Sequence, residues 1–150
     1  FTSLSKEAFP VIRYRTRDLT RLLPPTSRSF RRMGKITGRS DDMLIVRGVN
    51  VFPSQIEEQI LRDKRLSGNY QILLSRDGHL DNVEVRCELQ REVSGSLSAT
   101  DVAAISKELQ HHIKTIVGIS TRVTVLGFES IPRTLTGKAR RLIDERPKQN

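Results

Sequence analysis

An Asp-Gly pair at 77–78 separates two stretches that have the residue pattern of β-strands, and this arrangement constrains the fold more than any other feature of the chain. Residues 70–76 and 83–90 are therefore predicted strands, joined by the turn into an antiparallel hairpin. Alternation in the second strand is typical of a sheet with one buried face. Cys87 falls on the apolar side of that strand, so we expect a buried thiol and not a nucleophile.

Helical patterns precede and follow this hairpin. A helix is predicted to begin at Pro53, because proline fits a first helical turn and the apolar residues after it repeat at helical spacing, and residues 63–68 close it. A longer helix is predicted from a cap at Thr100-Asp101 to Gly118. Further short strands are predicted at 43–47, 50–52 and 121–126. The order predicts an α+β fold in which two helices pack on a small, mainly antiparallel sheet.

The first forty residues have a different character. Residues 11–23 read as extended, and the stretch from Arg13 to Arg39 holds eight arginines. Short polar side chains at 40–42 suit a bend. We therefore expect a domain boundary near Asp41, with a β-rich piece over residues 1–40 and the α+β domain over residues 41–150.

Charge and composition limit the classes of function that the chain can have. The formal net charge of +9 favours a polyanionic partner, so a small basic nucleic-acid-binding module is one alternative and a stand-alone interaction domain is another. The sequence has no tryptophan and two tyrosines, which leaves few platforms for stacking bases, so no nucleic-acid partner is expected.

The sequence also limits where in the cell the protein is expected and whether it is expected to bind a metal. No apolar stretch approaches the ~20 residues that span a bilayer, and a single cysteine cannot form an internal disulfide. We therefore expect a soluble cytoplasmic protein with no membrane partner. No metal site is predicted, since the three histidines lack acidic or cysteine companions at ligand spacing.

Residues 132–138 read Pro-Arg-Thr-Leu-Thr-Gly-Lys and are followed by further positive charges. A phosphate-binding P-loop would need glycine at position 132, where proline stands, so that motif is excluded. The remaining interpretation is a turn that presents the long cation of Lys138 to an anion. The plain alternative is a solvated basic tail.

Three motifs in this order resemble the C-terminal motifs of adenylate-forming enzymes. They are the run ending at Asp18, the Gly-Arg-Ser-Asp-Asp run at 38–42, and the lysine motif at 132–138. More narrowly, residues 9–18 and 47–57 resemble the phenylacetate–coenzyme A ligases. The resemblance extends from Phe1 to about Lys148, but the family's Ser/Thr/Gly-rich phosphate loop and its acid pocket find no match. The resemblance thus implies that residues 1–40 are a remnant of the large N-terminal adenylation domain and that residues 41–150 are the mobile C-terminal domain.

The resemblance also implies roles for five residues. Lys138 corresponds to the catalytic lysine of adenylate formation, and Asp18 and Arg39 to nucleotide-binding residues at the ribose of ATP. Asp41 corresponds to the hinge, and Gly48 to the glycine that lines the coenzyme A tunnel. ATP and coenzyme A are the implied cofactors, with Mg²⁺ expected to accompany ATP.

The resemblance implies an AMP-forming acid–thiol ligase that activates phenylacetate or a related aryl acid and transfers it to coenzyme A. Arg17 stands where many adenylate-forming enzymes have glycine, which fits the phenylacetate subgroup, whereas residues 131–134 are closer to the general acyl ligase form. Another carboxylic acid is therefore an alternative. The expected partners are the small-molecule substrates and the enzyme's own N-terminal domain, with a homodimer left open. The isolated chain is expected to be inactive.

Overall fold

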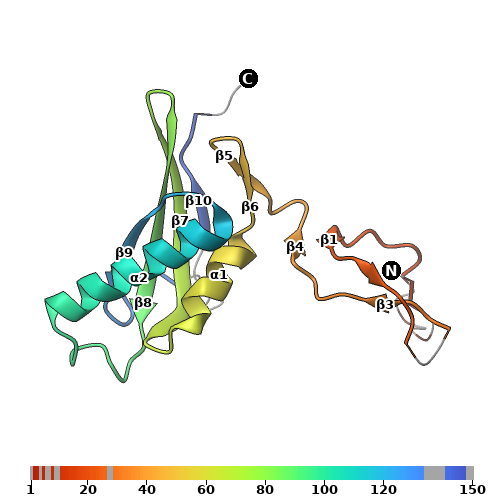
Figure 1. Ribbon diagram of the computed structural model, residues 1–150, viewed down its shortest axis with the longest axis horizontal. Helices are drawn as coiled ribbons and strands as arrows, with labels where there is room; N and C mark the ends of the chain where they lie inside the picture. The colour runs from red at the N-terminus through yellow and green to blue at the C-terminus, as the bar shows by residue number, and fades with distance from the viewer. Residues whose placement is uncertain are drawn as a thin grey trace. The chain divides into compact units, whose positions relative to one another are not determined.

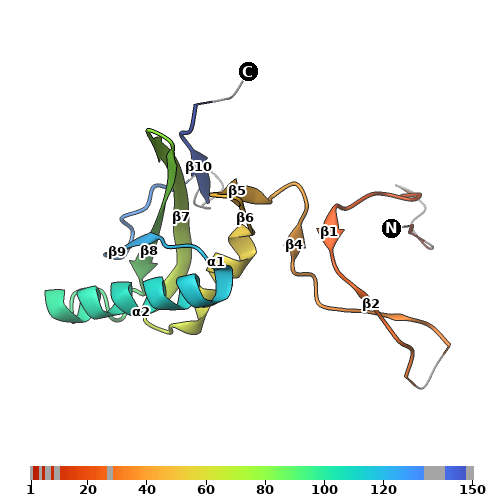
Figure 2. The same cartoon turned by 45° about the horizontal axis from the view of Figure 1, so that its top comes forward.

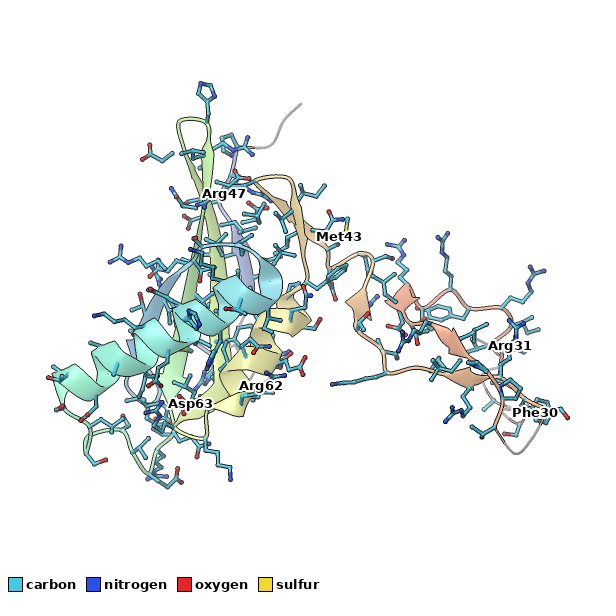
Figure 3. All side chains as sticks on the ribbon, viewed as in Figure 1. Phe30, Arg31, Met43, Arg47, Arg62 and Asp63 are labelled. Atoms are coloured by element: carbon cyan, nitrogen blue, oxygen red, sulfur yellow. The ribbon has the colours of Figure 1, made fainter. Side chains whose placement is uncertain are left out.

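The computed structural model describes residues 2–3, 5, 8, 11–26, 29–133 and 141–147. It divides into two units, Phe1–Met43 and Leu44–Asn150. The division falls two residues beyond Asp41. Met43, the last residue of the first unit, is labelled in Figure 3.

The first unit consists of short antiparallel ribbons. Strand β1 (Asp18–Leu19) pairs with β4 (Gly38–Arg39), and β2 (Leu22–Leu23) pairs with β3 (Arg32–Met33). Extended structure predicted over 11–23 is confirmed in β1 and β2 alone. Among the described residues, this unit contributes none to the buried core, and several of its large apolar side chains are exposed: Ile12, Leu22, Phe30 and Met33. Two-stranded ribbons of this length have no second layer against which to bury an apolar face.

The second unit is a layer of two helices on one face of a four-stranded sheet (Figures 1 and 2). The helices are α1 (Pro53–Arg62) and α2 (Ala99–Val117). The sheet has the order β10-β7-β8-β9, formed by β7 (Leu66–Asp77), β8 (Leu80–Leu89), β9 (Arg122–Leu126) and β10 (Leu142–Asp144). β7 and β8 are antiparallel, whereas both outer pairings are parallel. α2 connects β8 to β9, as a parallel neighbour requires a crossover.

The core lies between this sheet and the helices. Alternate positions of the hairpin strands supply Ile72, Leu74, Val83 and Val85, and the helices supply Ile56, Ile60, Ile105 and Ile113. Each such side chain contributes about 1.5–3 kcal/mol when it leaves water. Cys87 is buried on the same face, as predicted, and burial raises the pKa of its thiol to about 12.

The start of α2 differs from the prediction. Ser98, and not the Thr100-Asp101 pair, is the N-cap: its hydroxyl accepts from the Asp101 N–H at 3.2 Å, and the Asp101 carboxylate accepts from the Ser98 N–H at 3.0 Å. This reciprocal capping box satisfies two N–H groups that the first helical turn leaves free, which places the cap three residues before the carboxylate. The predicted end is confirmed, since Gly118 has a φ of 81°.

The predicted α+β class, with two helices on a small sheet, is confirmed. Four of the six strand pairings that the structure describes are antiparallel. Residues 63–68 are only partly a helix ending, because α1 ends at Arg62 and β7 already begins at Leu66. β10 was not predicted.

None of the helices in the described part of the chain has the length and apolar character needed to cross a bilayer.

Two isoleucines of α2 offer a test of the core. Ile113 is 0% exposed and Ile116 is 52% exposed. Ile113→Ala should lower the free energy of unfolding by about 2–5 kcal/mol, because it leaves a cavity under the helix. Ile116→Ala should change it by about 0.5 kcal/mol or less, as surface substitutions do. Urea unfolding followed by the helical circular dichroism signal compares the two, and equal losses would contradict this orientation of α2.

Candidate functional site

The two residues expected at the ribose are neighbours in the first unit. Asp18 in β1 and Arg39 in β4 are paired directly across the ribbon. Side chains opposite each other in an antiparallel pair start about 4.5–5.5 Å apart at their β-carbons. Strand pairing therefore brings together a carboxylate and a guanidinium that are far apart in the sequence.

Asp41 lies in the turn after β4 and joins the same group. Its carboxylate accepts a hydrogen bond from Arg39 Nη2 at 2.9 Å and lies 3.7 Å from Arg17 Nη1. The Ser40 N–H donates to the Arg17 carbonyl at 2.8 Å. Ion pairs this exposed typically contribute about 1 kcal/mol or less to stability, so they hold the Asp41 side chain in place only weakly.

Arg17 has a backbone conformation that favours glycine. Its φ is 65°, in the left-handed region. A side chain there costs roughly 1–2 kcal/mol relative to ordinary backbone. The departure from glycine noted in the sequence therefore carries a conformational cost at the residue directly before Asp18.

Gly48 lies in the turn between β5 (Leu44–Val46) and β6 (Val49–Val51). The two turn residues, Arg47 and Gly48, have φ values of 50° and 78°. Positive φ at both positions defines the tight hairpin turn that fits the twist of the strands, and glycine adopts it without strain. A β-carbon at Gly48 would meet no atom of the described residues within 4 Å, so the φ angle, and not crowding by those residues, accounts for the glycine.

This turn borders a groove of about 710 Å³. The groove is lined by Ile45, Arg47, Gly48, Arg76, Asp81, Asp144, Arg146 and Pro147. Arg47, labelled in Figure 3, donates from Nε to the Asp81 carbonyl at 2.7 Å. The Asp81 carboxylate accepts from Arg76 Nε at 2.7 Å and from Arg146 Nη1 at 3.2 Å.

Three arginines thus surround one aspartate, and the sequence reasoning missed Arg76, Asp81 and Arg146. Arg76 and Asp81 lie opposite each other across the predicted hairpin, so its turn could have indicated that pair, whereas Arg146 comes from the residues after β10 and no spacing in the sequence indicates it. Hydrogen bonding from Arg76, then from Arg146, holds the pKa of Asp81 below its ordinary value. Arg146 also donates to the Ile45 carbonyl at 2.9 Å, so this cluster ties β5 to the sheet.

Lys138 lies outside the described residues, in the stretch 134–140. The structure therefore does not test its predicted role. Within the described ranges, no three His, Cys, Asp or Glu side chains gather as a metal site would require.

Known proteins resemble both the sequence and the fold. The model of the AMP-binding enzyme C-terminal domain matches residues 48–146. The phenylacetate-coenzyme A ligase of Aromatoleum evansii is 54% identical over 149 residues, which cover 99% of this chain and 34% of that protein. The chain thus spans about a third of the length of the curated relatives it matches.

Two solved structures extend the comparison. A domain of phenylacetate-coenzyme A ligase from Bacteroides vulgatus is 28% identical, with a TM-score of 0.64, and the match covers 73% of this chain and 97% of that one. A 2-hydroxyisobutyryl-CoA ligase, in the postadenylation state in complex with R3-HIB-AMP, is 31% identical with a TM-score of 0.74. That match covers 91% of this chain and 29% of the ligase.

Asp81→Asn should make the protein less stable at neutral pH, because the amide cannot replace the charge between two arginines. The folded-state pKa lies below the ordinary 3.8, so the carboxylate stabilises the fold above pH 3.8 and loses this effect as the pH falls further. The difference in unfolding free energy between wild type and Asp81→Asn should therefore be largest near pH 7 and shrink below pH 3.8. Asp77→Asn, at the exposed turn of the same hairpin, is the control. A difference that stays constant with pH would contradict the ion-pair assignment.

Proposed function

Because the chain belongs to the AMP-binding enzyme C-terminal domain family, we propose that it is the C-terminal part of an AMP-forming acid–thiol ligase. In this proposal the whole enzyme activates phenylacetate, or a related aryl acid, with ATP and passes the acyl group to coenzyme A. The observation that carries the proposal is the 54% identity to a phenylacetate-coenzyme A ligase across nearly the entire chain.

In the first half-reaction the substrate carboxylate attacks the α-phosphorus of ATP and pyrophosphate leaves. Two anions must meet, so a cation between them stabilises the developing charge. Lys138 would supply it, because its long stem reaches far and its compact ammonium contacts several oxygens at once. Asp18 would accept hydrogen bonds from the ribose hydroxyls, and Arg39, its cross-strand neighbour, would approach the same sugar.

In the second half-reaction the thiolate of coenzyme A attacks the acyl carbonyl and AMP leaves. Gly48 has no side chain at the edge of the groove, and no atom of the described residues lies within 4 Å of the place that a β-carbon would take. This suits the passage of a thin pantetheine arm. Mg²⁺ would accompany the phosphates of ATP, as it does where it is bound mainly through substrate phosphates.

We propose that residues 1–40 belong to the base of the large N-terminal domain and that residues 41–150 form the domain that turns against it. The exposed apolar side chains of the first unit, such as Leu22 and Phe30, support this, since they need a cover that the described chain does not provide. The partner is then the enzyme's own N-terminal domain. A cytoplasmic location and a homodimer remain predictions from the sequence.

A ligase of the same chemistry on another acid is the second candidate. The similarity to a 2-hydroxyisobutyryl-CoA ligase favours it. Incubation of the full-length enzyme with ATP, Mg²⁺ and one acid at a time separates the two candidates. Pyrophosphate release with phenylacetate above that with 2-hydroxyisobutyrate supports the first, and the reverse order supports the second. The 150-residue chain alone should release none.

Lys138→Ala in the full-length enzyme should slow adenylate formation by about 10²-fold or more, the scale for loss of one preorganised charge. Thioester formation from supplied phenylacetyl-adenylate should persist, because that step uses the other face of the domain. Single-turnover measurement of each half-reaction checks this. An equal loss of both steps would argue against a role confined to adenylation.

Asp41→Pro should separate the half-reactions in the opposite sense. Proline fixes φ near −65° at the residue expected to absorb the domain rotation. The rate of adenylate formation should stay within about tenfold of wild type, while the rate of the thioester step should fall much further. The reason is that proline would block the rotation of the domain and not the bond chemistry. Asp41→Ala is the matched control, because it removes the contact with Arg39 without fixing φ. If both steps in Asp41→Pro were as fast as in Asp41→Ala, the hinge assignment would be wrong.

A further inference from the structure

The ribbon formed by β5 and β6 is short, and its turn is exposed. Each strand has three residues. Val46 and Val51 are buried in the core of the larger unit, whereas Arg47 and Gly48 in the turn are exposed. A two-stranded ribbon by itself is marginally stable in water. The position of the turn therefore depends on the contacts that the ribbon makes with other elements.

The outer edge of β5 offers a backbone acceptor close to this turn. Ile45 is paired with Asn50, and this pair comes directly after the pair that flanks the turn. In a ribbon with a two-residue turn, the flanking pair exchanges hydrogen bonds, and the next pair directs its backbone groups away from the partner strand. The Ile45 carbonyl therefore points outward from the ribbon, and there it accepts from Arg146 Nη1 at 2.9 Å.

Two aspartates hold the guanidinium of Arg146 in the orientation that this contact needs. Its Nε and Nη2 donate to the two carboxylate oxygens of Asp144 at 2.9 and 2.8 Å. Its Nη1 donates to Asp81 Oδ2 at 3.2 Å as well as to Ile45. A bidentate pair of this kind fixes the plane of the guanidinium. The side chain of Arg146 is 17% exposed, so water competes little for these contacts.

The backbone that carries Arg146 is attached to the sheet. Asp144 ends β10 and is paired with Leu74 of β7, and the Glu145 N–H donates to the Leu74 carbonyl at 2.8 Å. From the turn itself, Arg47 Nε donates to the Asp81 carbonyl at 2.7 Å. Two arginines thus link the ribbon to the four-stranded sheet, one from the turn and one from the chain after β10, and both reach Asp81.

We propose that Arg146 is a positioning residue for the thioester step, because it sets where the turn with Gly48 lies at the edge of the groove. It acts through the Ile45 carbonyl on one side and through Asp81 on the other. The part that Gly48 plays in admitting coenzyme A rests on the proposed function. A displaced turn would misalign the path of the pantetheine arm. Adenylate formation should be spared, since the residues expected at the ribose belong to the first unit.

Lysine cannot reproduce the contacts of Arg146. The guanidinium donates from three nitrogens to three groups, which are two carboxylates and one backbone carbonyl. An ammonium is a compact point charge on a single nitrogen, so it cannot span these acceptors in the same way. Arg146→Lys therefore keeps the charge and removes the bridge, which separates a positioning role from an effect of charge alone.

Arg65 offers a matched control elsewhere in the same unit. It also follows an aspartate by two positions, and its Nε and Nη2 donate to the two carboxylate oxygens of Asp63 at 2.9 and 2.7 Å. Its Nη2 also donates to Glu108 on α2 at 2.7 Å. Figure 3 labels Asp63 well apart from Arg47. Arg65→Lys therefore disrupts the same kind of arrangement between α1 and α2 instead of at the ribbon.

The test measures both half-reactions in the full-length enzyme. In Arg146→Lys, kcat/KM for coenzyme A, measured from supplied phenylacetyl-adenylate, should fall about tenfold or more, the scale for losing a hydrogen bond to a charged group. The rate of adenylate formation and its KM for ATP and acid should stay within about twofold of wild type, as should both steps of Arg65→Lys. A normal thioester step in Arg146→Lys, or an equal fall of both steps, would overturn the proposal.

Hydrogen–deuterium exchange gives a readout that needs no activity. Without the bridge from Arg146 the ribbon should open more often, so the amides of residues 44–51 should exchange about tenfold faster in Arg146→Lys than in wild type or Arg65→Lys. Mass spectrometry of peptic peptides measures this. Equal exchange rates would overturn the proposal. Faster exchange in an enzyme whose wild type shows no acid-dependent pyrophosphate release would retain the role of Arg146 in holding the ribbon and reject the proposed function.

Asp144→Asn serves if Arg146→Lys does not fold. The amide has one acceptor oxygen where the carboxylate has two, so it releases one side of the same guanidinium. The thioester step should again fall while adenylate formation persists. A normal thioester step in this variant would overturn the proposal.

Discussion

The pairing of β7 with β8 is the interaction on which the rest of the larger unit depends. One face of this hairpin carries the apolar residues against which both helices pack, and each of its edges accepts one further strand. On the opposite face of the hairpin, Glu88 accepts a hydrogen bond from Arg133. Near the turn of the hairpin, the Asp81 carbonyl accepts a hydrogen bond from Arg47 of the β5–β6 turn. Loss of this pairing would therefore disrupt the core, the groove and the contacts of Glu88 together.

The sequence predicted the elements whose signals are local. The turn at 77–78, the helix ending at Gly118 and the strand that became β9 need only their own neighbours in the chain. β10 could not be predicted from the sequence, because a strand of three residues shows no periodicity and its partner, β7, lies far earlier in the chain. Ser98 was missed although Ser98 and Asp101 have the spacing of a capping box, because the prediction placed the cap at the polar pair Thr100-Asp101.

The site was predictable to the extent that it resembled known motifs. Asp18, Arg39 and Asp41 were named from such motifs, and strand pairing explains why they meet. Glu88 looks in sequence like an outward-facing polar residue of an alternating strand, and Asp81 precedes the predicted strand. Glu88 is held by residues 43 and 45 positions away, and Asp81 by Arg146, 65 positions away, as well as by the nearer Arg47 and Arg76. No local pattern encodes the distant contacts. Arg17, directly before Asp18, and Arg47, directly before Gly48, both have positive φ angles. Two of the candidate site residues are therefore preceded by strained backbone.

The position of β9 and β10 at opposite edges of the sheet sets a length requirement on the chain between them. Neighbouring strands lie about 4.8 Å apart, so this connection must at least reach across the width of the sheet. The loop at 90–97 joins β8 to α2 and does not have to cross the sheet. Among relatives, shortening of the chain should therefore be tolerated more readily in the loop at 90–97 than in the connection between β9 and β10.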